Sequence, residues 1–188
     1  MLHPTYPMTT ERLILRPYGA GDLDALYETL RLPEVVRYLY WDVKDRDEAA
    51  KMLERRTTCD AIRAEGDWLV LAVVLKEGGA LLGDVVLKWE SAEHRKGEIG
   101  FVFNPAYHGK GYAYEASRAL LRLGFEEMRL HRIVGRCDAR NTSSARLMER
   151  LGMRREAHLV ENEWVKGEWT DELIYAMLDR EWAATIGS

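Results

Sequence analysis

A lysine between two glycines, preceded by a β-rich segment and followed by a helix-forming one, is the feature that most restricts how this chain can fold. Gly109 and Gly111 lie between a predicted strand at 98–103 and a helix predicted to begin near Tyr112. Glycine has no Cβ, so its backbone can approach a ligand closely and adopt φ angles that are closed to other residues. The first amides of a helix lack intrahelical partners, and with the helix dipole they favour phosphate. The chain therefore predicts a strand, a loop that cradles a phosphate-bearing ligand, and a helix.

Two familiar phosphate loops do not fit this segment. A Walker loop requires Gly-x-x-x-x-Gly-Lys-Ser/Thr, whereas here Lys110 lies between the glycines and neither Ser nor Thr follows Gly111. A dinucleotide fingerprint would place a third glycine at Tyr114 and would directly follow its strand. What remains is Gln/Arg-x-x-Gly-x-Gly/Ala, read from His108 to Ala113 with histidine at the first position. This segment resembles the acyl-CoA diphosphate loop of the GNAT N-acetyltransferase superfamily.

Other segments resemble the RimJ/RimL branch of that superfamily, the ribosomal-protein-alanine N-acetyltransferase type. They occur in the order of that branch, span nearly the whole chain, and comprise Thr10–Pro17, Pro33–Leu39, Gly111–Ala116, Asn141–Ser144 with Glu149–Met153, and Gly167–Asp171 with Glu181–Trp182. The sequence is therefore identified as a member of the GNAT superfamily. The resemblance implies an N-acyltransferase that uses acetyl-CoA, or another short acyl-CoA, as cosubstrate and needs no metal.

Composition limits the remaining classes of function. We expect one domain, 1–188, because the chain is long enough for one substantial core and short for two. Lys and Arg total 27 against 31 for Asp and Glu, so the basic field of a nucleic-acid binder is missing. No apolar run has the length of a signal peptide or a membrane span, which predicts a cytoplasmic protein. Cys59 and Cys137 are far apart and are expected to be reduced, without a role in catalysis or metal binding.

Residue patterns predict an α/β (α+β) fold of GNAT type, with a mixed, mostly antiparallel seven-stranded sheet flanked by about four helices. The predicted strands are 13–16, 68–76, 81–90, 98–103, 132–137, 155–165 and 169–178, and the predicted helices are 22–30, a short one from 33, 45–65, 112–128 and 142–151. Pro105 cannot donate to a strand ladder, so it ends the fourth strand. We expect strands four and five to splay there and to admit the cofactor between them.

The resemblance implies which residues hold the acyl-CoA. The implied set is His108, Gly109, Lys110, Gly111, Tyr112 and Ala113 for the diphosphate, Phe101, Val102 and Phe103 for pantetheine, and Asn141 and Ser144 on the helix that follows strand five. Strand residues would pair with the pantetheine amides as another strand does. A plain helix cap is the alternative for the Asn and Ser positions. The 3'-phosphate could meet Lys110, Arg118, Arg146 or Arg150, and the sequence does not choose among them.

Acetyl transfer also requires that the amine lose a proton. An N-terminal amine, with a pKa of about 7.7–8.0, loses it more readily than lysine at about 10.4. Glu98 is the first candidate for a base acting through water, because it opens the strand on which the thioester would lie, where some relatives carry a catalytic glutamate. A solvated charge paired with Lys96 or Arg95 is the alternative. Glu163 is the second candidate, either as a base or as a partner of a cationic substrate.

The leaving thiolate needs a proton donor. Many members of the superfamily place a tyrosine seven residues after the position of Asn141, but this chain has Met148 there, which cannot give a proton. Ser144 lies one turn earlier on the same helical face and resembles the serine proposed for this role in the RimL type. A hydroxyl is a weak acid, so Ser144 could instead position the sulfur or a water.

We expect the acceptor pocket where the early helices meet the late hairpin. Acidic residues outnumber basic ones in 154–172, which favours a positively charged amine, although a solvated hairpin face would look the same. The preferred lining set is Tyr38, Trp41, Trp89, Glu163 and Trp169, with Tyr40 and Trp164 as further candidate walls. His131 and His158 are expected to be structural.

Several functions remain open on sequence alone. The first is acyl transfer to a primary amine, either a protein N-terminus or a small molecule, by direct attack in a ternary complex. The second is a non-catalytic acyl-CoA binding or sensing module, suggested by Met148 and His108. A relative that uses succinyl-CoA is a further alternative, and family habit suggests a homodimer.

Overall fold

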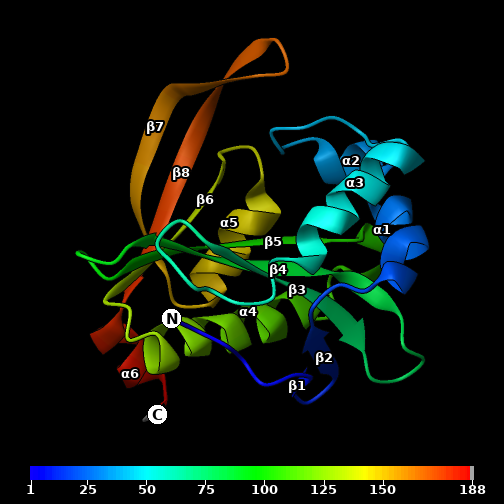
Figure 1. Ribbon diagram of the computed structural model, residues 1–188. Helices are drawn as coiled ribbons and strands as arrows, with labels where there is room; N and C mark the ends of the chain where they lie inside the picture. The colour runs from blue at the N-terminus through cyan, green and yellow to red at the C-terminus, as the bar shows by residue number, and fades with distance from the viewer. Residues whose placement is uncertain (187–188) are drawn as a thin grey trace.

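The computed structural model describes residues 1–186 as one mixed sheet with helices on both faces (Figure 1). The strand order is β1-β2-β3-β4-β5-β6-β8-β7, and every neighbouring pair is antiparallel except β5 and β6. The strands are β1 (Met8–Thr9), β2 (Leu13–Arg16), β3 (Trp68–Leu75), β4 (Leu81–Ser91), β5 (Lys96–Phe103), β6 (Arg132–Asp138), β7 (Arg154–Val165) and β8 (Glu168–Leu178). The α-helices are α1 (Leu23–Leu30), α2 (Pro33–Val36), α3 (Arg46–Thr57), α4 (Tyr112–Arg122), α5 (Thr142–Arg150) and α6 (Asp179–Ile186).

The predicted α/β class with a mixed, mostly antiparallel sheet is confirmed. The seven predicted strands correspond to β2–β8, and the eighth, β1, has two residues that pair with Leu15 and Ile14. Two residues are too few for an alternating pattern to reveal a strand. The described residues contain six α-helices where about four were expected; α2 is the short helix predicted from 33, and α6, which follows β8 directly, was not predicted.

The prediction of a helix over 45–65 was wrong at its C-terminal end. Helix α3 stops at Thr57, and the chain then turns toward the sheet. The Asp67 carboxylate accepts hydrogen bonds from the backbone amides of Arg63 and Ala64, which fixes that turn. Ile62 is fully buried and pairs with Leu2 in an isolated bridge. Burial of this apolar residue therefore outweighs the local helical preference.

The sheet has a core on each face. In β3 the side chains of Leu69, Leu71 and Val73 join the cluster beneath α4, α5 and α6, whereas Val70 and Ala72 join the cluster beneath α1 and α3. Because both faces are covered, β3 reads as an uninterrupted apolar run instead of an alternating one. Helices and strands that are covered on one face only can instead carry polar residues on the face that meets solvent.

The sheet opens between β5 and β6. Their parallel pairing runs only from Lys96–Arg132 to Ile99–Gly135. Beyond that point β5 stays paired with β4 as far as Phe103, and β6 stays paired with β8 as far as Asp138. The expected splay of the fourth and fifth predicted strands is confirmed, and it leaves the inner edge of the β5 segment 100–103 without a strand partner.

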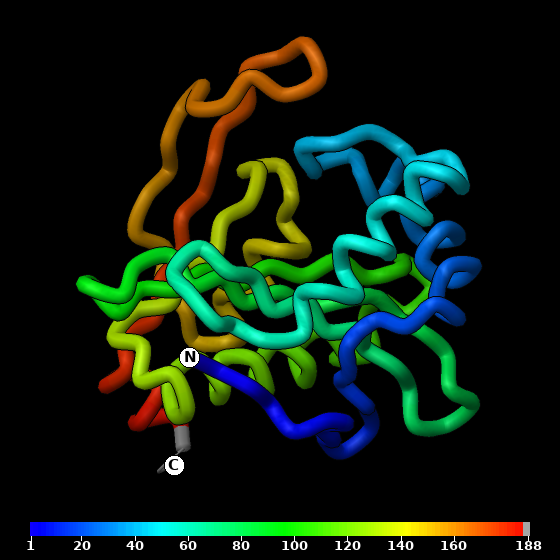
Figure 2. The backbone as a smooth tube through the Cα atoms, in the orientation of Figure 1, coloured from blue at the N-terminus to red at the C-terminus, as the bar shows by residue number. Residues whose placement is uncertain are grey.

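The β7–β8 hairpin rises beside the segment between α2 and α3, whereas α4 crosses the opposite face of the sheet (Figures 1 and 2). The Lys166 ammonium, in the turn of the hairpin, donates a 2.6 Å hydrogen bond to the Val36 carbonyl at the end of α2. The turn of the β7–β8 hairpin and the end of α2, which we call the two tips, are therefore in contact. Within residues 1–186, no helix combines the length and apolarity needed to cross a membrane.

Candidate active site

The glycine loop has the backbone conformation that its sequence predicts. Gly109 and Gly111 have φ angles of 75° and 81°, in the left-handed region that other residues rarely adopt. A Cβ added to Gly109 would meet no atom within 4 Å, so the loop faces open space there. The amide of Glu115 is the first in α4 to bond back to a carbonyl, that of Gly111, at 3.1 Å. The preceding amides therefore lack intrahelical partners and remain able to bind an anion.

Asn104 and His108 shape the start of this loop. The Asn104 side chain accepts a 3.0 Å hydrogen bond from the backbone amide of Ala106, and so begins a short 3-10 turn. The His108 imidazole lies 3.1 Å from the Phe103 carbonyl, at the end of β5. His108 thus has a partner within its own loop, which gives a structural reason for histidine at this position.

Arg12 braces the loop from outside. Its guanidinium donates a 3.0 Å hydrogen bond to the Lys110 carbonyl and forms a 2.7 Å ion pair with Glu115 in the first turn of α4. The Glu115 carboxylate also accepts hydrogen bonds from the Thr10 hydroxyl and the Arg12 backbone amide. Burial opposes ionisation of Glu115, but these hydrogen bonds hold its pKa below the usual range. Sequence reasoning did not assign this role to Arg12, because its partners are about a hundred residues away.

Glu98 lies at the other end of β5, just before the strands separate. It is opposite Lys88 on β4 and Val134 on β6, one residue before the last β5–β6 pair. Its carboxylate is 3.5 Å from the Arg136 guanidinium. Burial, followed by the neighbouring Glu90 carboxyl group, raises the pKa of Glu98 to about 7. A carboxyl group with this pKa can exchange a proton near neutral pH.

Further acidic groups gather around Glu98. Glu172 on β8 is 5% exposed and lies 3.4 Å from the Arg136 guanidinium. Its oxygen also accepts a 3.2 Å hydrogen bond from the Asn162 side chain. Partial burial raises the pKa of Tyr40, and so do the charges of Glu172, Glu163 and Glu98, which places these four groups in one electrostatic environment. Glu163, predicted from sequence, pairs with Thr170 on the hairpin and shares this influence on Tyr40, whereas Glu172 was missed because its burial depends on tertiary contacts.

Asn141 and Ser144 mark the start of α5, where β6 has already separated from β5. The Asn141 side chain accepts a 3.1 Å hydrogen bond from the Ser144 amide and caps the helix. Met148, at the position where a tyrosine acid was sought, is 1% exposed and packs on Gly135 of β6. Its side chain therefore belongs to the core and leaves no donor at that position.

The aromatic residues proposed for the acceptor pocket lie in three places. Tyr38 is stacked by the guanidinium groups of Arg37 and Arg140, at 5.1 and 5.9 Å from its ring centre. Trp41 is half-buried in the neighbouring loop, and its indole nitrogen has no hydrogen-bond partner among the residues described. Trp89 packs against the core cluster beneath α4, on the sheet face opposite the Glu98 group.

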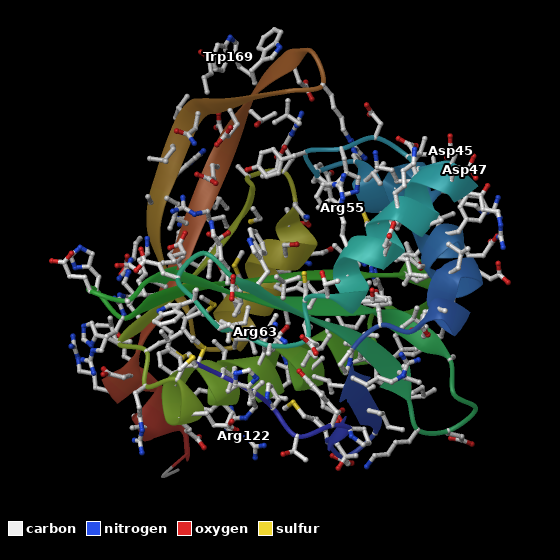
Figure 3. The ribbon with its side chains drawn as sticks, in the orientation of Figure 1. Asp45, Asp47, Arg55, Arg63, Arg122 and Trp169 are labelled. Atoms are coloured by element: carbon white, nitrogen blue, oxygen red, sulfur yellow. The ribbon has the colours of Figure 1, made fainter. Side chains whose placement is uncertain are left out.

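Trp169 lies far from Glu98. It packs edge to face against Trp164, with ring centres 5.3 Å apart, near the tip of the β7–β8 hairpin (Figure 3). Both side chains are more than half exposed. The structure thus keeps Trp89, Trp164 and Trp169 apart from Glu98, whereas the charges of Glu98 and Glu163 both act on Tyr40.

A hollow of about 520 Å³ lies beside Gly111, between the N-terminal segment 8–12 and one side of α4. Of the four residues considered for the 3'-phosphate, Arg118 and Arg150 line this hollow. Their guanidinium groups stack on Trp182 and Tyr114, at 5.2 and 4.4 Å from the ring centres. Lys110 lies in the loop itself, and Arg146 is exposed on α5. Two of the candidates are therefore adjacent to the glycine loop.

The other candidate groups have local partners. The His131 imidazole is 3.2 Å from the Asp179 carboxylate, and that of His158 is 2.7 Å from Asp171. Cys59 and Cys137 are free thiols, and burial with nearby carboxylates raises the pKa of Cys137 to about 12. In the part of the chain described, no group of three or more His, Cys, Asp or Glu side chains is arranged to hold a metal.

Comparison with known proteins agrees with this geometry. Residues 12–154 match the acetyltransferase (GNAT) domain. The chain is 37% identical over 175 residues to the uncharacterized N-acetyltransferase YnaD of Bacillus subtilis, covering 93% of this chain and 98% of that protein. It is 31% identical to spermidine N(1)-acetyltransferase of Vibrio cholerae, covering 85% and 89%. A crystal structure of a GNAT-family acetyltransferase from Bacillus anthracis superposes with a TM-score of 0.82 at 34% identity, covering 96% and 99%.

Proposed function

The chain belongs to the GNAT family of acetyltransferases and is an N-acetyltransferase, and on that premise we propose that it transfers acetyl from acetyl-CoA to a primary amine. The amine attacks directly, with both substrates bound. The observation that carries this proposal is the position of Glu98. It is a carboxyl group with a pKa of about 7 on the same strand as the phosphate loop, at the point where β5 and β6 begin to separate.

Acetyl-CoA fits the residues present. The left-handed Gly109 leaves room for a diphosphate against the free amides of the loop, and Arg12 holds that loop in place beside Gly111. Phe101, Val102 and Phe103 carry backbone groups on the unpaired edge of β5, where pantetheine amides could bind as a strand does. When bound, acetyl-CoA supplies the activated acyl group as a thioester. Asn141 and Ser144 flank the far side of the opening and would orient its thioester end.

Glu98 then acts on the acceptor. An amine bound as an ammonium ion cannot attack, so one N–H bond must break, with the electron pair staying on nitrogen and the proton passing to Glu98 directly or through a water. A base with a pKa of about 7 suits an α-amino group with a pKa of about 7.7–8.0 better than an ordinary carboxylate would. Ser144 is the candidate for orienting the sulfur or a water at the leaving group.

The charge around Glu98 supports a cationic acceptor. Glu98, Glu163 and Glu172 share a region in which Arg136 forms ion pairs with two of them. This negative surplus attracts an ammonium group and disfavours an anionic acceptor. A protein N-terminus, as in the RimJ/RimL-like branch that the sequence resembles, and a small polyamine, as the name of the Vibrio cholerae relative suggests, both meet this requirement.

A non-catalytic acyl-CoA binding module is the second candidate. The observation that favours it is the buried Met148, which leaves α5 without the tyrosine that other members use as an acid. Such a module would have the same phosphate loop and would bind acetyl-CoA without turnover. This alternative does not explain why Glu98 has a pKa of about 7, since binding of a cofactor requires no proton exchange at that site.

The two candidates can be separated by following release of the CoA thiol. Acetyl-CoA and, separately, succinyl-CoA are supplied with peptides bearing free Ala or Ser N-termini, with spermidine and with aminoglycosides. Turnover with acetyl-CoA and one amine class establishes the transferase and identifies its acceptor. A preference for succinyl-CoA would change the donor. Binding of acetyl-CoA by calorimetry with no thiol release across the panel would favour the binding module.

A further inference from the structure

Five charged side chains are linked in series on the sheet face covered by α1 and α3. The Lys96 ammonium is 2.9 Å from the Glu90 carboxylate, and Glu90 is the group that, after burial, most raises the pKa of Glu98. Glu98 is 3.5 Å from Arg136, and Arg136 is 3.4 Å from Glu172. The two carboxyl groups in the middle of this series are neighbours, so they cannot both ionise without repulsion.

The register of β4 and β5 explains why Glu90 lies between Lys96 and Glu98. Lys88 pairs with Glu98 and Ser91 pairs with Lys96, and the pairing shifts by one residue between them. Glu90 is in this irregular stretch and has no directly opposite residue. Side chains two residues apart on a strand share a face, so Lys88 and Glu90 on β4 face the same side as Lys96 and Glu98 on β5.

The cations are distributed unequally between the two carboxyl groups. Glu90 has Lys96 at 2.9 Å, whereas Glu98 has Arg136 at 3.5 Å and shares that guanidinium with the buried Glu172. Lys88 faces Glu98 from β4, and the charge of Glu98 acts on Tyr40 together with those of Glu172 and Glu163. The closer cation stabilises the ionised form of Glu90. The proton shared between the two groups therefore belongs on Glu98.

We propose that Glu90, kept ionised by Lys96, is a positioning residue that makes Glu98 the proton acceptor for the incoming ammonium group. This inference rests on the proposed function. In the step concerned, the N–H bond of the acceptor breaks, an O–H bond forms on Glu98, and the electron pair remains on nitrogen. Glu90 does not touch the substrate; its negative charge makes the Glu98 carboxylate more basic than a solvated carboxylate.

The test is Glu90→Gln, followed by the titration of Glu98 itself. Carbon-13 NMR of glutamate carboxyl groups, with the Glu98 signal assigned by its loss in Glu98→Gln, reports that titration without requiring activity. We expect the Glu98 midpoint near pH 7 to fall by at least about one unit in Glu90→Gln, because repulsion is lost and the new amide can donate to the carboxylate. The acid limb of kcat/KM should move with it, while KM for acetyl-CoA stays unchanged.

Glu93→Gln is the matched control, because Glu93 is exposed in the turn between the same two strands. An unmoved Glu98 midpoint in Glu90→Gln, or an equal shift in the control, would overturn the proposal. If Glu90→Gln does not fold, Lys96→Met serves, and there the Glu90 midpoint should rise toward neutral pH. A shifted midpoint in a protein that acetylates no amine would leave the coupling intact and refute the proposed function.

Discussion

Arg12 and Glu115 are 103 positions apart in the chain and form a 2.7 Å ion pair at the entrance to α4. The same guanidinium donates to the Lys110 carbonyl and stacks over Tyr112, 4.7 Å from its ring centre. One side chain before β2 thus contacts three residues of the loop and first turn that would hold the diphosphate. The phosphate loop owes its shape to this brace as well as to its glycines.

Replacing Arg12 should weaken cofactor binding more than it weakens the fold. In Arg12→Ala the loop loses the hydrogen bond at Lys110, so its amides are less well ordered before acetyl-CoA binds. We expect the Kd for acetyl-CoA to rise roughly fivefold, as for loss of one hydrogen bond. Calorimetry measures this, with Arg31→Ala as the control because Arg31 forms a surface pair with Glu28 within α1 and its C-cap. If both variants bind acetyl-CoA with equal affinity, Arg12 does not brace the loop.

The phosphate loop and most strands could be predicted because their signals are local. The glycines at 109 and 111 permit the left-handed φ angles that the loop adopts, and Pro105 ends β5 because it cannot donate to a strand ladder. The brace at Arg12 and the charge of Glu172 could not be predicted, since each depends on partners brought together only by the fold. The prediction that a helix extends to Glu65 was wrong for the same reason, because Ile62 is buried in the core.

Within the acceptor region, sequence placed Glu98 correctly on its strand but could not supply its pKa. That value depends first on burial and then on Glu90, which is adjacent only because β4 and β5 are antiparallel and irregular at that point. The aromatic residues show that residue type alone does not place a side chain in the site. Trp89 and Trp169 were chosen by residue type, and alternation along β4 and the length of the hairpin place them away from Glu98.

Glu98→Gln should lower activity and raise stability above neutral pH. Removing a general base typically reduces kcat by about 10²–10⁴-fold. The folded protein holds the Glu98 proton up to pH about 7, whereas the unfolded chain releases it near 4.5. The free energy of unfolding therefore decreases as pH rises from about 4.5 to 7, and this loss should disappear in Glu98→Gln. Urea unfolding at pH 5 and pH 8 measures it, and a wild-type pH dependence retained in the variant would contradict the assignment.

Disrupting the buried ion pair between α3 and β4 should strongly lower the free energy of unfolding. Arg56 pairs with Asp84, and the Tyr18 hydroxyl donates a 2.8 Å hydrogen bond to the same carboxylate. Asp84 is 2% exposed and lies opposite Val102 on β5. Arg56→Met leaves this carboxylate without its cation, so we expect a loss of about 3–5 kcal/mol in the free energy of unfolding.

Arg56→Met with Asp84→Asn should be less damaging than Arg56→Met alone, because no uncompensated charge then remains inside. Arg31→Met, which removes an exposed pair with Glu28, is the control and should change stability by less than about 1 kcal/mol. Urea denaturation of Arg56→Met, Asp84→Asn, the double variant and the control gives the comparison. A double variant as unstable as the sum of its single changes would show that the pair acts independently of its charges.

Lys166 should determine which acceptors reach Glu98. Its ammonium joins the β7–β8 turn to the Val36 carbonyl at 2.6 Å and lies 3.7 Å from Asp42, so it spans the two tips that border the acceptor region. Lys166→Met removes both contacts while keeping the length of the side chain. We expect kcat/KM for a peptide N-terminus to rise relative to that for spermidine, because the wider opening matters more for the larger acceptor. Asp42→Asn, which alters only the longer contact, should change this ratio less. If the ratio is the same in Lys166→Met and the wild type, the contact between the tips does not control access, and selection must come from the acidic groups around Glu98.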